Sequence, residues 1–225
     1  MKLIKRLFNI VLMPLPDKKK TTLGRPDAAS ATDVKATILK VAEDLFAQSG
    51  YAATSIREIA DRSDANPAMI HYYFGNKESL LKAVLEKALS PLADSIEAMQ
   101  SEHEVAPAEI VDTLMDTIAS HPNLPYLIIR EVMLPGGVMQ AHFAEHLAPR
   151  LGGALPGLLE REIKNGRISV DTPPAIGALT LMSLAIFPFI VRPVAEQVLD
   201  VHMSGPAVVE LKKHISRFVE KGFSS

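Results

Sequence analysis

Three residues in the second half of the sequence have the spacing of a zinc hydrolase site. His142, Glu145 and His146 form the pattern H-x-x-E-H, and on a helix the two histidines share one face. A catalytic zinc also needs a third protein ligand, and any downstream Glu or His could supply it, so the pattern identifies none. We therefore expect His142 and His146 to be ordinary residues on a helix surface. The chain is expected not to be an enzyme and to use no metal or cofactor. A zinc-dependent hydrolase is the alternative.

A second group of residues with suitable chemistry lies in the run NPAMIHYYFGNKESLL, residues 66–81. Met69 can make an apolar contact with a thymine methyl group, and His71 and Tyr72 can reach phosphates or base edges. The run therefore has the chemistry of a nucleic-acid-binding surface.

Neighbouring residues could contact the phosphates. The small side chains of Pro67 and Ala68 would let a helix N-terminus, with its free N–H groups, approach a phosphate closely. Thr54 and Ser55 could donate hydrogen bonds to phosphate, and Lys77 could contact the backbone beside the groove.

Local sequence signals predict the helices that carry these side chains. A helix with a single apolar stripe is predicted from residue 32 to Gly50. A second helix begins at the capping box formed by Ser55 and Glu58. Asn66 is a suitable N-cap for a third helix over residues 67–74, since a proline at the first helical position loses no hydrogen bond.

The two short helices and the tight turn between them form a helix-turn-helix motif over residues 55–74, whose second helix can lie in a DNA major groove. Ile70, Tyr73 and Phe74 have the spacing i, i+3, i+4 and are expected to pack inward. The remaining side chains of that helix would then face outward. Two helices packed only for stability are the alternative for this motif.

The segment AATSIREIADRSDANPAMIHYYFGNKESLL resembles the DNA-binding domain of the TetR family of transcriptional regulators, over about residues 32–92. The resemblance implies a homodimer that binds a near-palindromic operator and holds a small effector in its C-terminal domain. The family's DNA-contact positions fall here on Thr54, Ser55, Asn66, Pro67, Ala68, Met69, His71, Tyr72 and Lys77. Asp64 replaces the usual glycine of the turn, and aspartate tolerates a left-handed conformation better than most residues. Pro67 and Ala68 replace more polar residues, which leaves fewer direct hydrogen bonds to bases.

Residues 1–31 are predicted to be a basic arm without regular structure. They include LGRP, which resembles the basic arm that many family members carry and that can reach a minor groove. Residues 1–89 contain 14 Lys and Arg against 10 Asp and Glu, whereas residues 90–225 contain 10 against 16. We expect four arm residues to add salt-dependent affinity for DNA, namely Lys18, Lys19, Lys20 and Arg25.

The rest of the chain is predicted to be helical, since no stretch alternates with period two. A fourth helix should run from Lys77 toward Leu89, and further helices are expected at residues 92–102, 107–120, 124–134, 138–148, 155–165, 173–190 and 206–221. The fold class is therefore all-α, with an N-terminal helix-turn-helix domain at residues 32–92. A C-terminal helical bundle for effector binding and dimerisation follows at residues 93–225.

Two apolar stretches could be read as membrane segments. The first, residues 7–15, contains Asn9 and Pro14 and is followed by lysines where a signal peptide needs small residues. The second, residues 175–191, is short for a membrane span and contains Pro188, so we expect a buried helix. With no cysteine in the chain, the expectation is a cytoplasmic protein without a membrane partner.

The C-terminal domain is expected to hold a small, hydrophobic effector and to form the dimer. Flexible and aromatic side chains suit an adaptable apolar pocket, for which we select Met115, Met133, Met139, His142, Phe143, His146 and Met182. Pairing of the long apolar helix and the last helix would form a four-helix interface, for which we select Leu179, Ile186, Leu211, Ile215 and Phe218. The function predicted from the sequence is a ligand-responsive transcriptional regulator, most often a repressor in this family.

Overall fold

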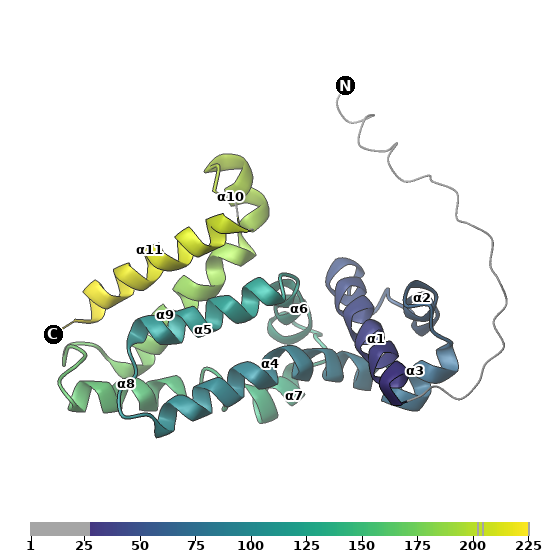
Figure 1. Ribbon diagram of the computed structural model, residues 1–225, viewed down its shortest axis with the longest axis horizontal. Helices are drawn as coiled ribbons and strands as arrows, with labels where there is room; N and C mark the ends of the chain where they lie inside the picture. Colours follow the sequence, from purple (N-terminus) through teal and green to yellow (C-terminus); the bar gives the residue numbers. More distant parts are fainter. Residues whose placement is uncertain (1–27, 202, 204, 225) are drawn as a thin grey trace.

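The computed structural model describes residues 28–201, 203 and 205–224. Its described part is all-helical and has no strand, which confirms the predicted fold class. The N-terminal unit consists of α1 (Ala28–Ser49), α2 (Ile56–Arg62) and α3 (Pro67–Phe74). The long helix α4 (Lys77–Ser101) leads from this unit into the C-terminal helices (Figure 1).

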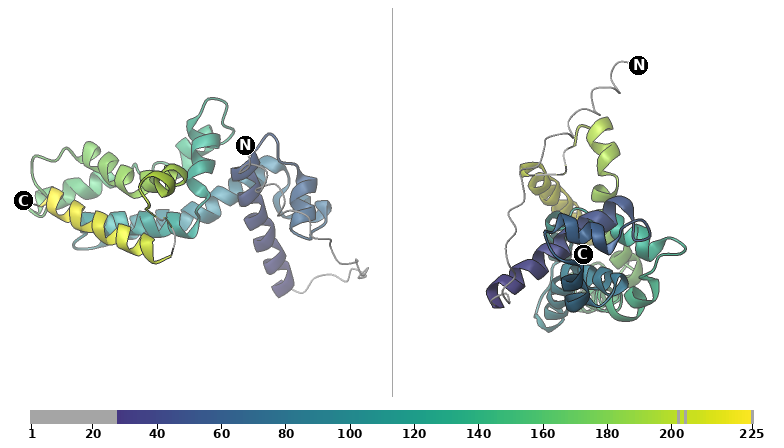
Figure 2. Two further views of the ribbon diagram at one scale, coloured as in Figure 1. Left: turned by 90° about the horizontal axis from the view of Figure 1, so that it is seen from above. Right: turned by 90° about the vertical axis from the view of Figure 1, so that its right-hand side faces the viewer.

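The C-terminal helices begin with α5 (Pro107–Ser120) and α6 (Leu124–Ile128), which continues as the π-helical segment η2 (Ile129–Met133). After a loop come α7 (Gln140–His142) and a second π-helical segment, η3 (Phe143–Leu147). The chain ends with α8 (Leu155–Lys164), α9 (Pro174–Ile190), α10 (Arg192–Val198) and α11 (Pro206–Phe223). Helix α5 packs against α9 and α11, and α8 packs against α9 (Figure 2).

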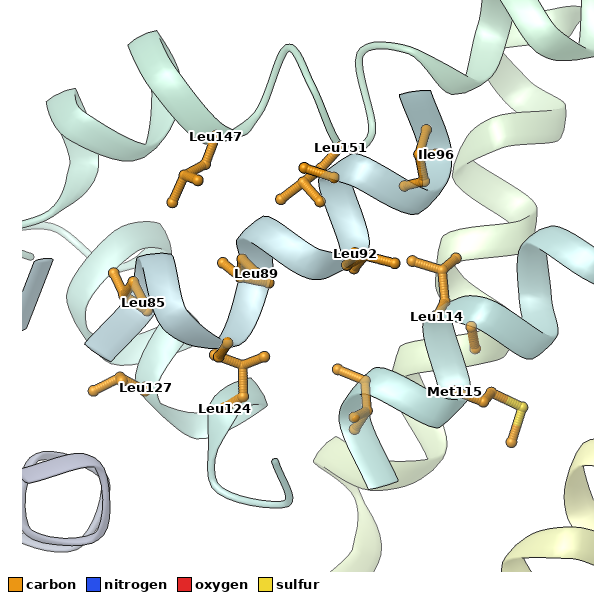
Figure 3. Packing of buried hydrophobic residues seen from close by; sticks show 14 of the residues in the cluster. Leu85, Leu89, Leu92, Ile96, Leu114, Met115, Leu124, Leu127, Leu147 and Leu151 are labelled. Atoms are coloured by element: carbon orange, nitrogen blue, oxygen red, sulfur yellow. The ribbon is translucent and has the colours of Figure 1, made fainter. Parts of the chain in front are cut away.

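Apolar side chains from α4 hold the bundle together. Leucine and isoleucine residues spaced three or four apart on α4 point toward side chains of α5, α6, η3 and the segment after η3 (Figure 3). The residues that meet there are buried, namely Leu85, Leu89, Leu92, Ile96, Leu114, Met115, Leu124, Leu127, Leu147 and Leu151. This shared core ties α4 to the C-terminal bundle, while its first turns remain packed on the N-terminal unit.

The predicted break at Pro91 does not occur. Helix α4 continues through Pro91 to Ser101, so the expected separate helix at residues 92–102 is wrong. Proline removes one backbone hydrogen bond, but Leu89 and Leu92 on either side are buried, and their packing outweighs that local cost.

Two other features of the C-terminal half differ from the sequence prediction. The short helix α10 was not expected, and the predicted helices at 124–134 and 138–148 each change to π-helical geometry part of the way along. A π-helix shows no distinct sequence periodicity over a single turn, so apolar spacing alone could not predict it.

The apolar stretch at residues 175–191 forms α9, but the expectation that it is buried on all sides is corrected. Leu181, Ala185 and Phe189 are buried, whereas Ile176 and Phe187 are about 60% exposed, at 62% and 58%. Among the described residues no single helix has the length and hydropathy of a membrane span. Helices α9 and α10 together would pass that test, but they are bent by 69° relative to each other.

Candidate nucleic-acid interface

The helix-turn-helix forms as its capping residues predict. Ser55 Oγ accepts a hydrogen bond from Glu58 N at 3.1 Å and so caps α2. Asn66 Oδ1 accepts one from Ala68 N at 2.9 Å and caps α3. Asp64 in the turn has φ 51°, which is the left-handed conformation that was expected where the glycine is missing. The start and direction of α3 are therefore determined by local hydrogen bonds.

Helix α3 separates its side chains into an inner and an outer face. Ile70 and Phe74 are buried and Tyr73 packs partly buried against the core, as predicted. On the other side, Tyr72 is 84% exposed and His71 is exposed. The outer face continues to the helix start, where the predicted contact residue Met69 is half-buried. Three further predicted contact residues there are exposed, namely Asn66, Pro67 and Ala68.

His71 has a fixed orientation. Its Nδ1 lies 2.7 Å from the carbonyl oxygen of Gly75, which ends α3 with φ 80°. Because a carbonyl only accepts, Nδ1 carries the proton and Nε2 remains free on the exposed side. In the neutral ring, Nε2 can then accept a hydrogen bond from a base amino group.

Thr54 is corrected as a DNA contact. Its side chain is 1% exposed, and its hydroxyl donates to Leu45 O at 3.2 Å and to Gly50 O at 2.9 Å. A hydroxyl that is already bonded inside the protein cannot donate to a phosphate as well. Ser55, the next residue, is exposed.

Lys77 is also bonded within the protein. Its Nζ donates to Tyr51 O at 2.8 Å and to Thr54 O at 3.0 Å, and it lies 4.2 Å from the centre of the Tyr51 ring. Two of the three N–H groups of this ammonium are thus used within the protein, and its contact with the DNA backbone stays a prediction. The sequence could not show these hydrogen bonds, because the partners of Lys77 lie 23 and 26 residues earlier.

The excess of basic residues in the N-terminal half lies outside the described part of the domain. Residues 28–89 contain seven Lys and Arg against eight Asp and Glu, a net charge of −1, whereas residues 1–27 contain seven against two. The predicted arm residues Lys18, Lys19, Lys20 and Arg25 lie outside the described residues. Within the domain, Arg57 and Arg62 on α2 are exposed basic side chains that the sequence prediction did not include.

The predicted effector residues differ in their exposure, and none of them lines the cleft between α4 and α5. Met133 is 66% exposed and His146 is exposed, so both are corrected as pocket-lining residues. The other five are Met115 and Met139, which are buried, and His142, Phe143 and Met182, which are half-buried. A cleft of about 410 Å³ instead opens between α4 and α5, lined by Ala88, Pro91, Leu92, Ser95, Thr113, Asp116, Thr117, Ser120 and His121.

The two histidines of the H-x-x-E-H pattern stack on each other, with ring centres 4.7 Å apart. Nε2 of His142 lies 3.3 Å from Glu86 Oε1, and burial, followed by the charge of Lys82, lowers the pKa of His142. In the part of the chain that the structure describes, no three His, Asp or Glu side chains are grouped so as to hold a metal ion.

The predicted dimer residues differ in how far they are exposed. Leu179 on α9 and Phe218 on α11 are each 60% exposed, and Ile186 and Leu211 are half-buried. Ile215 is only 6% exposed and packs in the core of its own chain, so it is corrected as an interface residue.

Comparison with known proteins identifies the N-terminal unit. A profile described as "Bacterial regulatory proteins, tetR family" matches residues 38–84. An HTH-type transcriptional repressor of Mycobacterium tuberculosis is 39% identical over 103 residues, which are 46% of this chain and 48% of the repressor. An HTH-type transcriptional repressor of Streptomyces coelicolor is 36% identical over 129 residues. These residues are 55% of this chain and 64% of that repressor. The chain thus spans about half the length of the first of these relatives.

Solved structures match over a longer part of the chain. The structure of a transcriptional regulator from Aquifex aeolicus matches with a TM-score of 0.62 at 16% sequence identity. The match covers 84% of this chain and 99% of the Aquifex chain. A TetR/AcrR-family regulator from Thermobifida fusca has a TM-score of 0.58 at 23% identity, with coverage of 86% and 100%. These similarities show that the fold extends through both units. Residues 38–84 thus match the tetR family of bacterial regulatory proteins, and the chain as a whole has the fold of solved TetR/AcrR-family regulators.

Proposed function

We propose that this chain is a sequence-specific, ligand-responsive transcriptional repressor that binds a palindromic operator as a homodimer. The observation that carries the proposal is the outer face of α3, where His71 and Tyr72 are exposed on a helix whose start is fixed by Asn66. A DNA-binding helix needs such a rigid, solvent-facing set of side chains to enter a major groove. The proposed place of action is the cytoplasm, where the operator is accessible.

The C-terminal helices supply the other two parts of the proposal. Exposed apolar residues on α9 and α11, such as Leu179 and Phe218, support dimerisation through these helices. The cleft between α4 and α5 supports binding of a small effector, because α4 leads directly from the cleft to the DNA-binding unit. A transcriptional regulator from Saccharomonospora viridis with the same fold has been solved in complex with choline.

The reading face of α3 can be tested with a duplex that the wild-type protein selects from a random pool. We expect His71→Ala and Tyr72→Ala each to weaken binding to this duplex by about tenfold, since one interaction with a base contributes about 1–3 kcal/mol. Binding to an unrelated duplex should change little. Fluorescence anisotropy measures both affinities.

Lys164→Ala is the matched control, because Lys164 lies on α8 and its side chain is 71% exposed. It should bind like the wild type. Normal binding by the His71→Ala, Tyr72→Ala double variant would show that α3 is not the reading helix.

The basic arm should supply most of the salt-dependent affinity, since the described part of the domain has a net charge of −1. Replacement of Lys18, Lys19 and Lys20 by glutamine is expected to lower the slope of log affinity against log salt by up to about 3, because each phosphate that a lysine neutralises contributes about one unit. Titrations at several salt concentrations measure this slope. An unchanged slope would exclude the arm from the interface.

A further inference from the structure

The DNA-binding unit and the C-terminal helices meet at the loop between α1 and α2, residues 50–54. Helix α6, which continues into η2, lies beside α1 (Figure 1). Arg130 at the start of η2 donates to Ala47 O at 3.4 Å near the end of α1. Its side chain comes so close to Gly50 that a Cβ there would lie 3.1 Å from Arg130 Nη1. The loop directly precedes Ser55, the N-cap of α2, so its position determines where the helix-turn-helix begins.

Glu131, the next residue of η2, reaches into this loop. Its side chain is 5% exposed, and its Oε1 accepts a hydrogen bond from Tyr51 N at 3.0 Å. The hydrogen bond joins two residues that are 80 positions apart in the chain. Burial, with smaller contributions from the carboxylates of Glu78 and Glu131, raises the pKa of Tyr51.

Tyr51 is held from the opposite side by α4. Its carbonyl oxygen accepts from Lys77 Nζ at 2.8 Å, and the same ammonium group lies over its ring. The N–H of this one residue is therefore bonded to the C-terminal domain and its C=O to the first residue of α4. A displacement of either partner is expected to move the loop with it. Otherwise a partly buried polar group of Tyr51 would be left without a hydrogen bond, which costs free energy.

The loop after η2 determines where Glu131 lies. Met139 N donates to the Glu131 carbonyl oxygen at 2.9 Å, and at Gly137 a Cβ would lie only 2.4 Å from that oxygen. At the end of η2, an i→i+5 hydrogen bond runs from Leu134 N to Ile129 O at 2.9 Å. Conversion of such a π turn to α geometry would rotate the side chains by about 100°, one residue position, and would withdraw Glu131 from Tyr51.

We propose that Glu131 is a positioning residue that couples the conformation of the C-terminal domain to the helix-turn-helix through the backbone of Tyr51. The inference rests on the proposed function, because it assigns the contact through which an effector would change operator affinity. When η2 and its loop hold Glu131 in place, α2 and α3 keep the orientation that reads DNA. When η2 rearranges, the Tyr51 N–H loses its acceptor and the start of α2 is released.

The test compares Glu131→Ala, which removes the acceptor, with Glu131→Gln, which keeps an acceptor oxygen. Glu145→Ala is the matched control, because Glu145 is an exposed glutamate on the neighbouring segment η3. Hydrogen exchange of the full-length protein is followed in peptides from residues 51–74. Affinity is measured for a selected duplex of about 30 bp, long enough for two half-sites one turn apart.

We expect Glu131→Ala to raise exchange in residues 51–74 and to weaken duplex binding about tenfold, a typical coupling effect. Glu131→Gln and Glu145→Ala should stay within about twofold of the wild type. Gly137→Ala leaves the carboxylate unchanged but displaces the Glu131 backbone, and it should reproduce the exchange pattern of Glu131→Ala.

Two results would overturn the proposal. One is wild-type exchange over residues 51–74 in both Glu131→Ala and Gly137→Ala. The other is an equal rise of exchange in α5, α8 and α9, which would show that Glu131 serves only overall stability. If the wild-type protein selects no duplex from the pool, the proposed function fails, whereas the exchange comparison still decides the coupling.

Discussion

Replacement of Lys77 by alanine is expected to destabilise the helix-turn-helix domain and to abolish most of its operator binding. The variant removes two hydrogen bonds to Tyr51 O and Thr54 O and the interaction with the Tyr51 ring. Hydrogen bonds from a charged group and a cation–π interaction together give an expected destabilisation of about 2 kcal/mol, which lowers the melting temperature by about 5 °C. The affinity should fall by more than tenfold, because the start of α2 is no longer held.

Lys82→Ala provides the comparison on the same helix. Lys82 is 45% exposed and lies 3.9 Å from Glu86, so its removal should change the melting temperature by less than about 1 °C. Calorimetry and anisotropy on both variants measure stability and binding separately. If Lys77→Ala lost DNA binding at an unchanged melting temperature, Lys77 would be a direct phosphate contact, as the sequence alone predicts.

Replacement of Glu162 by alanine is expected to cost about 3 kcal/mol of stability, the lower end of the range for breaking a buried ion pair. Glu162 is 1% exposed, and its two oxygens accept from Arg161 Nε and Arg167 Nε. The low end applies because both arginine side chains are partly exposed, at 28% and 30%. Arg161 also donates to Gln100 O at 2.8 Å, so the cluster joins α8 to the end of α4.

This ion pair should make stability depend on pH in a defined direction. Burial by itself would raise the pKa of Glu162, but hydrogen bonds from Arg167 and Arg161 outweigh it and hold the pKa below its usual value. A carboxylate with a lowered pKa in the folded state stabilises the protein above its unfolded pKa. That stabilisation is lost as the pH falls through the folded value. The difference in unfolding free energy between wild type and Glu162→Gln should therefore shrink between about pH 7 and about pH 3.

Thermal unfolding of both proteins across this range measures the difference. Glu160→Gln is a matched control, because Glu160 is 57% exposed and pairs with Lys164 on the surface of the same helix. It should change stability little at any pH. A difference between wild type and Glu162→Gln that stays constant with pH would show that folding does not shift the pKa of Glu162.

Much of the DNA-binding unit could be predicted from the sequence because its helices begin and end at local signals. Asn66, Pro67 and Gly75 define α3 over the residues that were predicted, and Ser55 caps α2 as expected. Each of these signals acts through a hydrogen bond or a backbone angle within four residues. The inward direction of Ile70 and Phe74 follows from helical spacing in the same way.

The C-terminal half was less predictable because its features depend on packing between distant segments. Pro91 did not end α4, since buried neighbours on both sides outweigh one missing hydrogen bond. Ile215 and Phe218 were both selected for the dimer interface, but only the fold decides that Ile215 enters the core while Phe218 stays exposed.

By itself, the sequence determined the helix-turn-helix, its capping and the exposed residues of α3, since these depend on interactions between near neighbours. Only the tertiary structure decided what Thr54, Lys77 and Glu131 do. All three belong to the junction around the loop between α1 and α2, and Lys77 and Glu131 reach their partners from 23 to 80 residues away. Such contacts form when buried polar groups find one another as the two units pack, and no local pattern in the sequence specifies which groups will meet.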